Sequence, residues 1–583
     1  METWRFRLTS SLVWLMGLVV IVRLFYWQVL SADKLQAIAE VQHSSTVEIP
    51  SQRGRILASD GFPLVGNEPS YLLYAYLPAF EANPDEVSEQ LSPLLVGEPE
   101  DLGATPSGEV REEMLDTTYN QIKENLTQDD LAWVPIKRAV KEETKKSIEA
   151  LNIGGLGFES GQSRYYPEAS MAAQVTGFVG SDANGTQLGY FGLEGYYDLE
   201  LKGKSGFIHQ EKDALGRPIV VGNFQNIDSR DGRDLLTHID RGIQYMVERM
   251  LKDALERYGA AAGEVMIMDP KTGGIMALAS LPSFEQKHFK RYEPSLYKLP
   301  SVADTYEPGS TFKALVVAAA LNEDVIEPDQ ICQEECRGPV TIGKYTIRTW
   351  NNEYHEGQTV TEILEHSDNV GMVWVGQKLG KEKFEAYLDK FGMTERTGID
   401  VEGETVPTTR DRWGDIDLAT GSFGQGLAVT SVGMLGAFGA IANGGVLMEP
   451  HLVNKVIGDK EVEIKPKEIR RVIEEETAKT ISEMLESAVS SGEAQWTQIK
   501  GYRVAGKTGT AQIPIAGHYD EEKTIASFVG FAPVDDPKFV MLVKLREPTS
   551  SPWAAETAAP LWMNIAKELL EKFKVVAAAA AAE

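Results

Sequence analysis

YEPGSTFKALVVAAAL, residues 306–321, places Ser310 at the mouth of an Ala/Val/Leu-rich helix and Lys313 one turn further on. Residues three apart lie on one helix face with Cβ atoms about 5–6 Å apart, so the two side chains can touch. Pro308 and Gly309 end any earlier helix, which places Ser310 near the first turn, where unpaired N–H groups and the helix dipole favour a developing anion. The pattern fits either a reactive Ser–Lys pair or an N-cap serine followed by a snorkelling lysine.

A nucleophilic serine needs a base to take its proton, and the usual base is histidine. None of the eight histidines lies near Ser310 in the sequence, and no G-x-S-x-G frame supports His355, His366 or His451 in that role. A lysine desolvated against an apolar helix can serve instead, because burial lowers its pKa and leaves a free amine. The segment therefore indicates Lys313 as the base for Ser310.

Two more short motifs follow, EHSDNVG at 365–371 and GKTGTAQ at 506–512. They contribute the candidate residues Ser367, Asn369, Lys507, Thr508, Gly509 and Thr510, with Asp368 between the first two. Each motif alone is weak, since S-D-N also forms Asx turns and N-caps, and K-T-G also marks a strand with a glycine kink. The set S-x-x-K, S-D-N and K-T-G in this order, however, is the signature of penicillin-binding proteins and class A β-lactamases.

The K-T-G segment has the chemistry of an anion-binding strand. At the period of two of a β-strand, Thr508 and Thr510 point to the same side, while Gly509 allows a substrate backbone to approach closely. The two hydroxyl groups can bind a terminal carboxylate, and Lys507 supplies positive potential beside it. The N–H groups of Ser310 and Thr510 are the expected oxyanion donors.

The flanking sequence predicts an α/β (α+β) fold built on one antiparallel sheet. Strand-like runs occur at 264–269, 275–280, 504–513, 526–533 and 538–545. An amphipathic helix at 241–258 and a second helix at 559–573 are expected to cover this sheet. Residues from about 300 to 500 are expected to form a mostly helical inserted lobe, and residues 31–230 to be rich in loops, with helical patches at 109–131 and 139–151.

Length and composition exclude several classes of protein. At 583 residues the chain is long enough for three or four domains. A formal net charge of -29 without a Lys/Arg-rich block argues against nucleic-acid binding. Because the sequence has no zinc spacing, Walker loop or dinucleotide fingerprint, we expect no cofactor and no metal.

The N-terminus carries an apolar segment, residues 8–30, with 23 residues. At 1.5 Å a residue it forms about 34 Å of helix, enough to cross a hydrocarbon core of about 30 Å. Arg5 and Arg7 precede it, so the positive-inside rule places residues 1–7 in the cytoplasm and the rest outside. We favour an uncleaved anchor over a signal peptide, because no A-x-A site follows. Arg23, inside the span, either snorkels outward or faces a partner in the membrane.

The chain has two cysteines, Cys332 and Cys336, both on the expected exported side. They either form a small-loop disulfide in an oxidising compartment or stay reduced and structural. Two thiols alone make a weak metal site.

With these motifs the chain resembles the class B penicillin-binding proteins, monofunctional peptidoglycan DD-transpeptidases, over nearly all of its exported part. SQRGRILASDGFPL (51–64) is similar to the membrane-proximal motif R-G-x-I-x-D-x-x-G of that family. Arg53, Gly54 and Gly61 match it, and Ala58 or Ser59 replaces the usual acid. The resemblance implies that these residues hold a non-catalytic pedestal together.

Other stretches extend the resemblance. RYYP (164–167) and GLEGYYDLELKGKSG (192–206) are similar to pedestal motifs, with Glu194 in the expected place. GSFGQGLAVT (421–430) and IASFVGFAP (525–533) also fit the family. LPSFEQKHF (281–289) departs from the P-x-x-D-P-N that the family commonly has, which leaves the structure of that loop open.

The resemblance also implies a domain order. It predicts a cytoplasmic tail at 1–7, an anchor at 8–30, a dimerisation-like pedestal at 31–230, a penicillin-binding transpeptidase domain at 231–575 and an Ala-rich tail at 576–583. The fold implied for 231–575 is that of the penicillin-binding proteins and serine β-lactamases. The implied location is the cytoplasmic membrane, with a single pass.

For the site, the resemblance implies that Ser310 forms an acyl-enzyme with a D-Ala-D-Ala stem peptide or with penicillin. Ser367 would relay a proton, Asn369 would donate to the substrate amide, and Lys507, Thr508 and Thr510 would bind the carboxylate. The implied partners are peptidoglycan stem peptides, β-lactams and a polytopic membrane glycosyltransferase of the division or elongation complex. The compact region after Lys507 slightly favours the division type.

Three other functions are less consistent with the sequence. A class A β-lactamase needs a glutamate for deacylation within E-x-x-x-N, and Glu402 and Glu404 lack that Asn. A membrane-bound β-lactam sensor of the known type would carry H-E-x-x-H, which does not occur. An idle scaffold would have no need of three complete motifs, and acylation by labelled penicillin distinguishes it from an enzyme.

Overall fold

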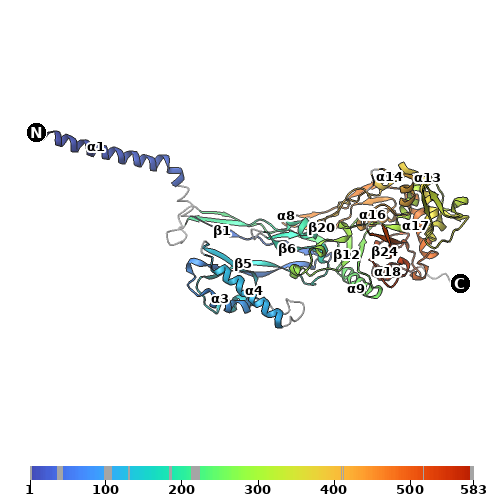
Figure 1. Cartoon of the computed structure of the whole chain (residues 1–583), viewed down its shortest axis with the longest axis horizontal. Coiled ribbons are helices and arrows are strands. Elements are labelled where there is room, and N and C mark those ends of the chain that lie inside the picture. The colour runs from blue at the N-terminus through green and yellow to red at the C-terminus, as the bar shows by residue number, and fades with distance from the viewer. Residues whose placement is uncertain are drawn as a thin grey trace. The chain divides into compact units, whose positions relative to one another are not determined.

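The computed structural model describes residues 3–35, 44–96, 108–128, 131–182, 187–211, 224–408, 410, 412–515 and 518–577 (Figure 1). It divides into two compact units, Met1–Arg53 with Lys202–Gly232, and Gly54–Leu201 with Arg233–Glu583. Most of the predicted Ala-rich tail, from residue 578 on, lies outside the described residues, as do residues 1 and 2 of the predicted cytoplasmic tail.

The first unit contains the apolar helix and a small sheet. Helix α1 (Thr3–Phe25) continues into a π-helical turn, Tyr26–Leu30, and together they are long and apolar enough to cross a membrane. The helix starts before residue 8, the first residue of the predicted span, because nothing in residues 3–7 stops it. Strands β1 (Ser44–Ile49), β8 (Gly206–Glu211) and β9 (Phe224–Ile227) form an antiparallel sheet in that order.

The second unit contains the predicted antiparallel sheet. Its order is β12 (Ile275–Leu281), β11 (Ala262–Met268), β25 (Phe539–Arg546), β24 (His518–Ala532) and β23 (Ala505–Ile515). All neighbouring strands run antiparallel. Strand β23 carries K-T-G and lies at the sheet edge, as predicted, which leaves one side of that motif open to a ligand.

Alternation along β11 sorts its side chains onto two layers. Val265 and Ile267 pack with α9 (Arg241–Tyr258) and α18 (Ala558–Lys572), whereas Met266 and Met268 pack with α16 (Ser431–Ala442). Helices α9 and α18 contact each other (Figure 1). The prediction that the first and last helices cover the sheet is confirmed, and the fully buried α16 covers the opposite face.

Among the regular elements of the inserted lobe helices predominate over strands, as predicted, although loops make up much of it. Besides α16, its helical elements include α10 (Pro300–Ala303), the 3-10 turn η6 (Gly309–Phe312), α11 (Lys313–Asn322), α12 (Val360–Glu365), α13 (Asn369–Leu379), α14 (Lys381–Lys390), α15 (Asp415–Gly421) and α17 (Glu475–Ser490). Short strand pairs join them: β13 (Thr305–Tyr306) with β18 (Val429–Thr430), β14 (Ile331–Cys332) with β17 (Gln358–Thr359), β15 (Val340–Ile342) with β16 (Tyr345–Ile347), and β19 (Val446–Met448) with β22 (Glu468–Arg471).

A second sheet joins strands of the predicted pedestal to strands of the predicted transpeptidase domain. Its order is β21 (Glu461–Glu463), β20 (Val453–Ile457), β10 (Asp234–Thr237), β2 (Ile56–Leu57), β3 (Pro63–Tyr76) and β4 (Trp133–Val140), and β5 (Leu156–Tyr165) also pairs with β3. The predicted helical patches appear as α4 (Gly108–Leu126) and α5 (Glu142–Glu149), which accompany α3 (Pro84–Leu95).

The long strands of this region were not predicted from the sequence. Gly66, Asn67 and Pro69 interrupt the apolar pattern of β3 and resemble turn residues. Pairing with β5 through the whole of that stretch keeps it extended. Tertiary contacts here outweigh local preference.

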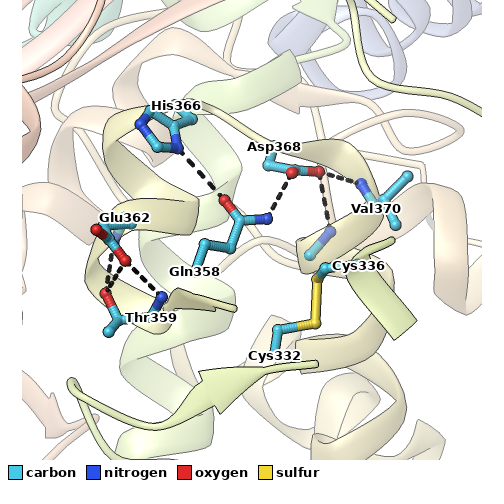
Figure 2. Close-up of a disulfide and its surroundings, with 9 residues drawn as sticks. Cys332, Cys336, Gln358, Thr359, Glu362, His366, Asp368 and Val370 are labelled. Atoms are coloured by element: carbon cyan, nitrogen blue, oxygen red, sulfur yellow. Dashed lines mark hydrogen bonds between the residues drawn. A yellow bond between two sulfur atoms is a disulfide. The ribbon is translucent and has the colours of Figure 1, made fainter. Parts of the chain in front are cut away.

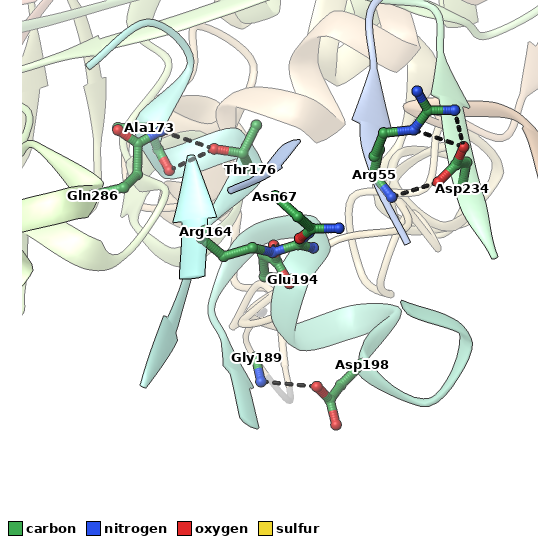
Figure 3. Close-up of polar contacts among 10 residues, drawn as sticks. All are labelled: Arg55, Asn67, Arg164, Ala173, Thr176, Gly189, Glu194, Asp198, Asp234 and Gln286. Atoms are coloured by element: carbon green, nitrogen blue, oxygen red, sulfur yellow. Dashed lines mark hydrogen bonds and ion pairs between the residues drawn. The ribbon is translucent and has the colours of Figure 1, made fainter. Parts of the chain in front are cut away.

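The pedestal motifs make structural contacts (Figure 3). Glu194, in α7 (Gly192–Tyr196), is 0% exposed and pairs at 2.6 Å with Arg164, which is 7% exposed and also donates to Asn67 Oδ1 at 2.7 Å. Arg55 binds Asp234 through its backbone N–H and its guanidinium group, and so ties β2 to β10. These contacts are those of residues that hold a fold together.

The departing segment 281–289 packs into an aromatic cluster. Phe289 stacks on Phe178 of β6 (Phe178–Ser181), which pairs with β7 (Gln187–Tyr190), with ring centroids 4.1 Å apart. Buried Gln286 donates to Thr176 Oγ1, at the end of α6 (Ala173–Thr176), over 3.1 Å. A further short helix, α8 (Asp198–Leu201), follows α7. The segment thus packs the predicted transpeptidase domain against the predicted pedestal.

Candidate active site

The turn that carries Ser310 is fixed from two sides. Ser310 lies in η6, and Lys313 is the first residue of α11. Gly309 N donates to Gly424 O at 3.0 Å. On the other side, a Cβ on Gly509 would lie 2.8 Å from Thr311 Cγ2, so β23 packs directly on the turn. The structure thus gives Gly509 a packing reason to be glycine, beside the substrate approach expected from the sequence.

Lys313 is fully buried, and its amine lies between the two outer residues of S-D-N. Nζ donates to Ser367 O at 2.5 Å and to Asn369 Oδ1 at 2.8 Å, and lies 3.3 Å from Ser367 Oγ. Burial and, to a smaller extent, the positive charge of Lys507 lower the pKa of Lys313 to about 7, against the opposing negative charges of Asp368 and Glu493. Burial and the nearby positive charge both disfavour the ammonium form.

This geometry suits a neutral amine. An uncharged Nζ has two N–H groups, and the two carbonyl oxygens of Ser367 and Asn369 can accept them. The remaining lone pair is then available for a hydroxyl proton. In the described part of the chain no hydrogen bond joins Ser310 Oγ to Lys313, and such catalytic contacts often tighten only when substrate binds.

The S-D-N loop is held in an unusual conformation by Asp368 (Figure 2). Ser367 has φ 53°, in the left-handed region that costs a non-glycine residue about 1–3 kcal/mol. Asp368 accepts from Val370 N at 2.7 Å and so caps α13, and it also accepts from Gln358 Nε2 at 2.6 Å. Asp368 and Gln358 therefore position Ser367 and Asn369. Sequence patterns alone predicted no separate role for Asp368, and no local motif marked Gln358.

The two cysteines form a disulfide, which answers the question that the sequence left open. Cys332 lies opposite Gln358 in the β14–β17 pair. Figure 2 shows the disulfide close to the Gln358–Asp368 contact. The cross-link therefore belongs to the scaffold beneath the S-D-N loop.

On the edge strand, Lys507 is 3% exposed, and burial lowers its pKa. Its Nζ donates to Thr508 Oγ1 at 3.1 Å. Thr510 Oγ1 accepts from Ala554 N at 3.0 Å and keeps its own proton for a ligand. Thr508 Oγ1, in contrast, donates to the carboxylate of Glu493 at 3.0 Å. The sequence did not single out Glu493.

The histidines that the sequence set aside have other partners. His366 Nδ1 shares a hydrogen bond with Gln358 Oε1, and its ring stacks on His355. His451 Nδ1 lies 3.1 Å from Glu449 O. None of these contacts involves Ser310, so the histidines hold the fold.

The glutamates considered for deacylation are also engaged elsewhere. Glu402 accepts from Phe191 N at 2.9 Å, and Glu404 accepts from Thr397 N at 2.6 Å. Both bonds fix loops. Within the described residues there is no group of three or more His, Cys, Asp or Glu that could hold a metal ion.

Two family models match the chain. The penicillin binding protein transpeptidase domain matches residues 263–571, and the penicillin-binding protein dimerisation domain matches residues 48–237. The first match contains all three motifs.

Curated relatives match over most of both chains. Stage V sporulation protein D of Bacillus subtilis (strain 168) is 33% identical over 569 residues, 96% of this chain and 84% of that protein. The peptidoglycan D,D-transpeptidase FtsI of Escherichia coli (strain K12) is 27% identical over 582 residues, 98% of this chain and 92% of that protein.

Solved structures share the fold. A peptidoglycan synthetase from Bifidobacterium adolescentis superposes with a TM-score of 0.72 at 25% identity, over 93% of this chain and 98% of that one. Penicillin binding protein 3 of Mycobacterium tuberculosis, complexed with aztreonam, gives a TM-score of 0.67 at 24% identity, over 91% of this chain and 98% of that one.

Proposed function

The chain belongs to the penicillin-binding protein transpeptidase family, and from this we propose that it is a peptidoglycan D,D-transpeptidase that works through an acyl-enzyme on Ser310. The observation that carries the proposal is the buried Lys313 amine, held by Ser367 and Asn369 one turn from Ser310. No cofactor enters the reaction.

In the acylation step, Lys313 takes the Ser310 proton while Oγ attacks the carbonyl carbon of the penultimate D-Ala. The backbone N–H groups of Ser310 and Thr510 receive the developing oxyanion. As the C–N bond breaks, a proton passes through Ser367 to the leaving nitrogen, and the terminal D-Ala departs as an amine. Asn369 donates to the substrate amide. With a β-lactam the same bond breaks, but the leaving nitrogen stays tethered.

In the second step, an amine of another stem peptide attacks the ester carbonyl of the acyl-enzyme. Its proton returns through Lys313 to Ser310 Oγ, and a new amide bond forms as the ester breaks. Lys507, Thr508 and Thr510 bind the carboxylate of the donor in the first step. Because Glu402 and Glu404 are bonded to loops, the proposal includes no water-activating glutamate.

Intact-mass measurement after treatment with benzylpenicillin tests this function. We expect one adduct on the native chain, located on Ser310 by peptide mapping, and no adduct on Ser310→Ala. The adduct is expected to persist for hours. Rapid hydrolysis of the penicillin ester is a property of a β-lactamase, and a transpeptidase does not need it. An adduct on another residue, none on the folded native chain, or rapid turnover would contradict the proposal.

The membrane helix supports a single-pass membrane protein. We propose that residues 1–7 lie in the cytoplasm, that residues 31–230 act as a pedestal and that residues 231–575 catalyse outside the membrane. The matches at 48–237 and 263–571 support these domain limits.

The Arg23 guanidinium lies 5.0 Å from the Trp27 ring and 5.6 Å from the Tyr26 ring, so aromatic rings of its own helix offer it cation–π contacts.

The partner proposed for this helix and pedestal is a polytopic membrane glycosyltransferase that polymerises the glycan strand. Replacing residues 1–30 with an unrelated single-pass anchor is expected to lower its co-purification and to impair growth. Changing Arg23 to Lys alone is the matched control, because it keeps the charge. The identity of the captured polymerase also separates the proposed division role from elongation. If the chimera co-purifies with the polymerase and supports growth as well as the native chain does, the membrane helix is not part of the contact surface, and only the pedestal remains as a candidate.

A further inference from the structure

A carboxylate of the chain itself already contacts the strand proposed to bind the substrate carboxylate. Glu493 lies between α17 and the 3-10 turn η8 (Gln495–Thr497), and its Oε2 accepts from Thr508 Oγ1 at 3.0 Å. Its backbone is anchored, because Ala494 is buried and a Cβ on Gly492 would lie 2.2 Å from Ala488 O. The side chain itself is exposed to solvent.

The contact uses a proton that the substrate also needs. A threonine hydroxyl has one O–H to donate. Lys507 Nζ donates to the Thr508 oxygen at 3.1 Å, and Thr508 directs its own proton to Glu493. While this contact lasts, Thr508 cannot donate to the carboxylate of a stem peptide or a β-lactam.

The surroundings of Lys507 also indicate that Glu493 occupies part of the place of a substrate carboxylate. In the part of the chain that the structure describes, Lys507 Nζ bonds to Thr508 and forms no direct ion pair. The negative charge of Glu493 acts on it at longer range, opposing the lowering of its pKa by burial. A carboxylate bound beside Lys507 would give this buried cation a direct counter-ion.

We propose that Glu493 is a specificity-determining residue that competes with the substrate carboxylate for Thr508. Before a carboxylate-bearing donor binds, Glu493 must release Thr508. It must also move away from the negative charge of the donor carboxylate. The inference rests on the proposed carboxylate site of Lys507, Thr508 and Thr510. It means that the resting enzyme disfavours small anionic ligands such as penicillins relative to donors that gain binding elsewhere along the stem and glycan.

Two effects of removing Glu493 on carboxylate binding oppose each other, whereas a third, the loss of a negative charge that raises the pKa of Lys313, acts alike on both charged and neutral probes. Loss of Glu493 frees Thr508 and removes a like-charge repulsion, which raises binding of a carboxylate. Its loss also removes a negative charge that favours the protonated form of Lys507, which weakens binding of a carboxylate. The first effect is larger, because the Thr508 bond is direct, whereas an exposed carboxylate without an ion pair to Lys507 is screened by water.

The test compares two probes that differ in one charge, benzylpenicillin and its methyl ester, on the full chain in detergent. Glu493→Gln is expected to raise the second-order acylation rate with benzylpenicillin about fivefold, the factor for one like-charge pair about 4 Å apart in water. The rate with the methyl ester is expected to stay within about twofold of native, since one surface charge is small for a neutral probe. Glu493→Ala is expected to act in the same direction, which separates loss of the charge from gain of an amide donor.

Glu483→Gln is the matched control, because it removes one exposed carboxylate from α17 itself. It is expected to leave both rates unchanged. An unchanged or lower rate of Glu493→Gln with benzylpenicillin overturns the inference, and so does an equal rise with both probes. These outcomes differ from failure of the proposed function, in which the native chain itself forms no adduct on Ser310.

Discussion

Replacing Lys313 with methionine is expected to lower the rate of acylation by benzylpenicillin by about 10²–10⁴-fold or more, the usual loss when a general base is removed. Methionine is similar in length and apolar, so it fits a site that is 0% exposed, but it cannot take the Ser310 proton. The measurement is the second-order rate of adduct formation on the full chain.

The native enzyme should also show this base in its pH dependence. Because the pKa of Lys313 is lowered to about 7, the fraction of neutral amine grows as pH rises through 7. Acylation is therefore expected to rise through that range and to level above it, whereas Lys313→Met should lose the rise.

Lys381→Met is the control for Lys313→Met, since Lys381 is an exposed lysine of α14 in the same lobe. It is expected to keep the native rate and the native pH profile. If Lys313→Met keeps its melting temperature and still reacts within tenfold of the native rate, another group takes the Ser310 proton.

Replacing Arg164 with methionine is expected to destabilise the proposed pedestal by about 3–5 kcal/mol, the usual loss when one partner is removed from a buried ion pair. Glu194 is 0% exposed, so water cannot replace the guanidinium group without opening the structure. Asn67 Oδ1 would lose the hydrogen bond from Arg164 as well. At about 2–4 °C per kcal/mol for a region of this size, the first thermal transition should fall by about 6 °C or more.

Arg337→Met is the matched control, since Arg337 and Glu356 form an ion pair in which both side chains are at least half exposed, at 62% and 50%. Such pairs contribute about 0–1 kcal/mol. Adding Glu194→Gln to Arg164→Met should recover part of the loss, because the buried side chain that has lost Arg164 becomes neutral. A shift for Arg164→Met no larger than that of the control would show that the buried pair is not what stabilises the pedestal.

Patterns that are local in the sequence predicted the catalytic half of the fold. The period of 3.6 in residues 241–258 and the alternation in 264–269 each depend on one buried face, and α9 and β11 match them. The three motifs were found because each has its spacing within a few residues. A local pattern also predicted that K-T-G lies on an edge strand, and β23 is at the edge of its sheet.

Contacts between distant residues could not be predicted in this way. Gln358 reaches Asp368 only through the β14–β17 pair and the disulfide beside it, and Glu493 reaches Thr508 only because α17 packs along β23. Gln and Glu are ordinary surface residues, so composition gives no signal at either position. In β3, Gly66 and Pro69 concealed a strand that its partners hold extended.

The second sheet has a consequence for the order in which parts of the chain can fold. Strand β10 lies between β2 on one side and β20 on the other, and Thr237 Oγ1 donates to Leu57 O across a sequence separation of 180 residues. The edge of β2 that pairs with β10 therefore has no partner until β10 has been made. The other edge of β10 has none until the much later β20 has been made. Contacts of such separation form slowly, and unpaired strand edges invite aggregation in the meantime. In the topology proposed above, translocation would deliver an unfinished sheet to the outer face of the membrane, and the proposed pedestal would complete its folding only after β20 had crossed.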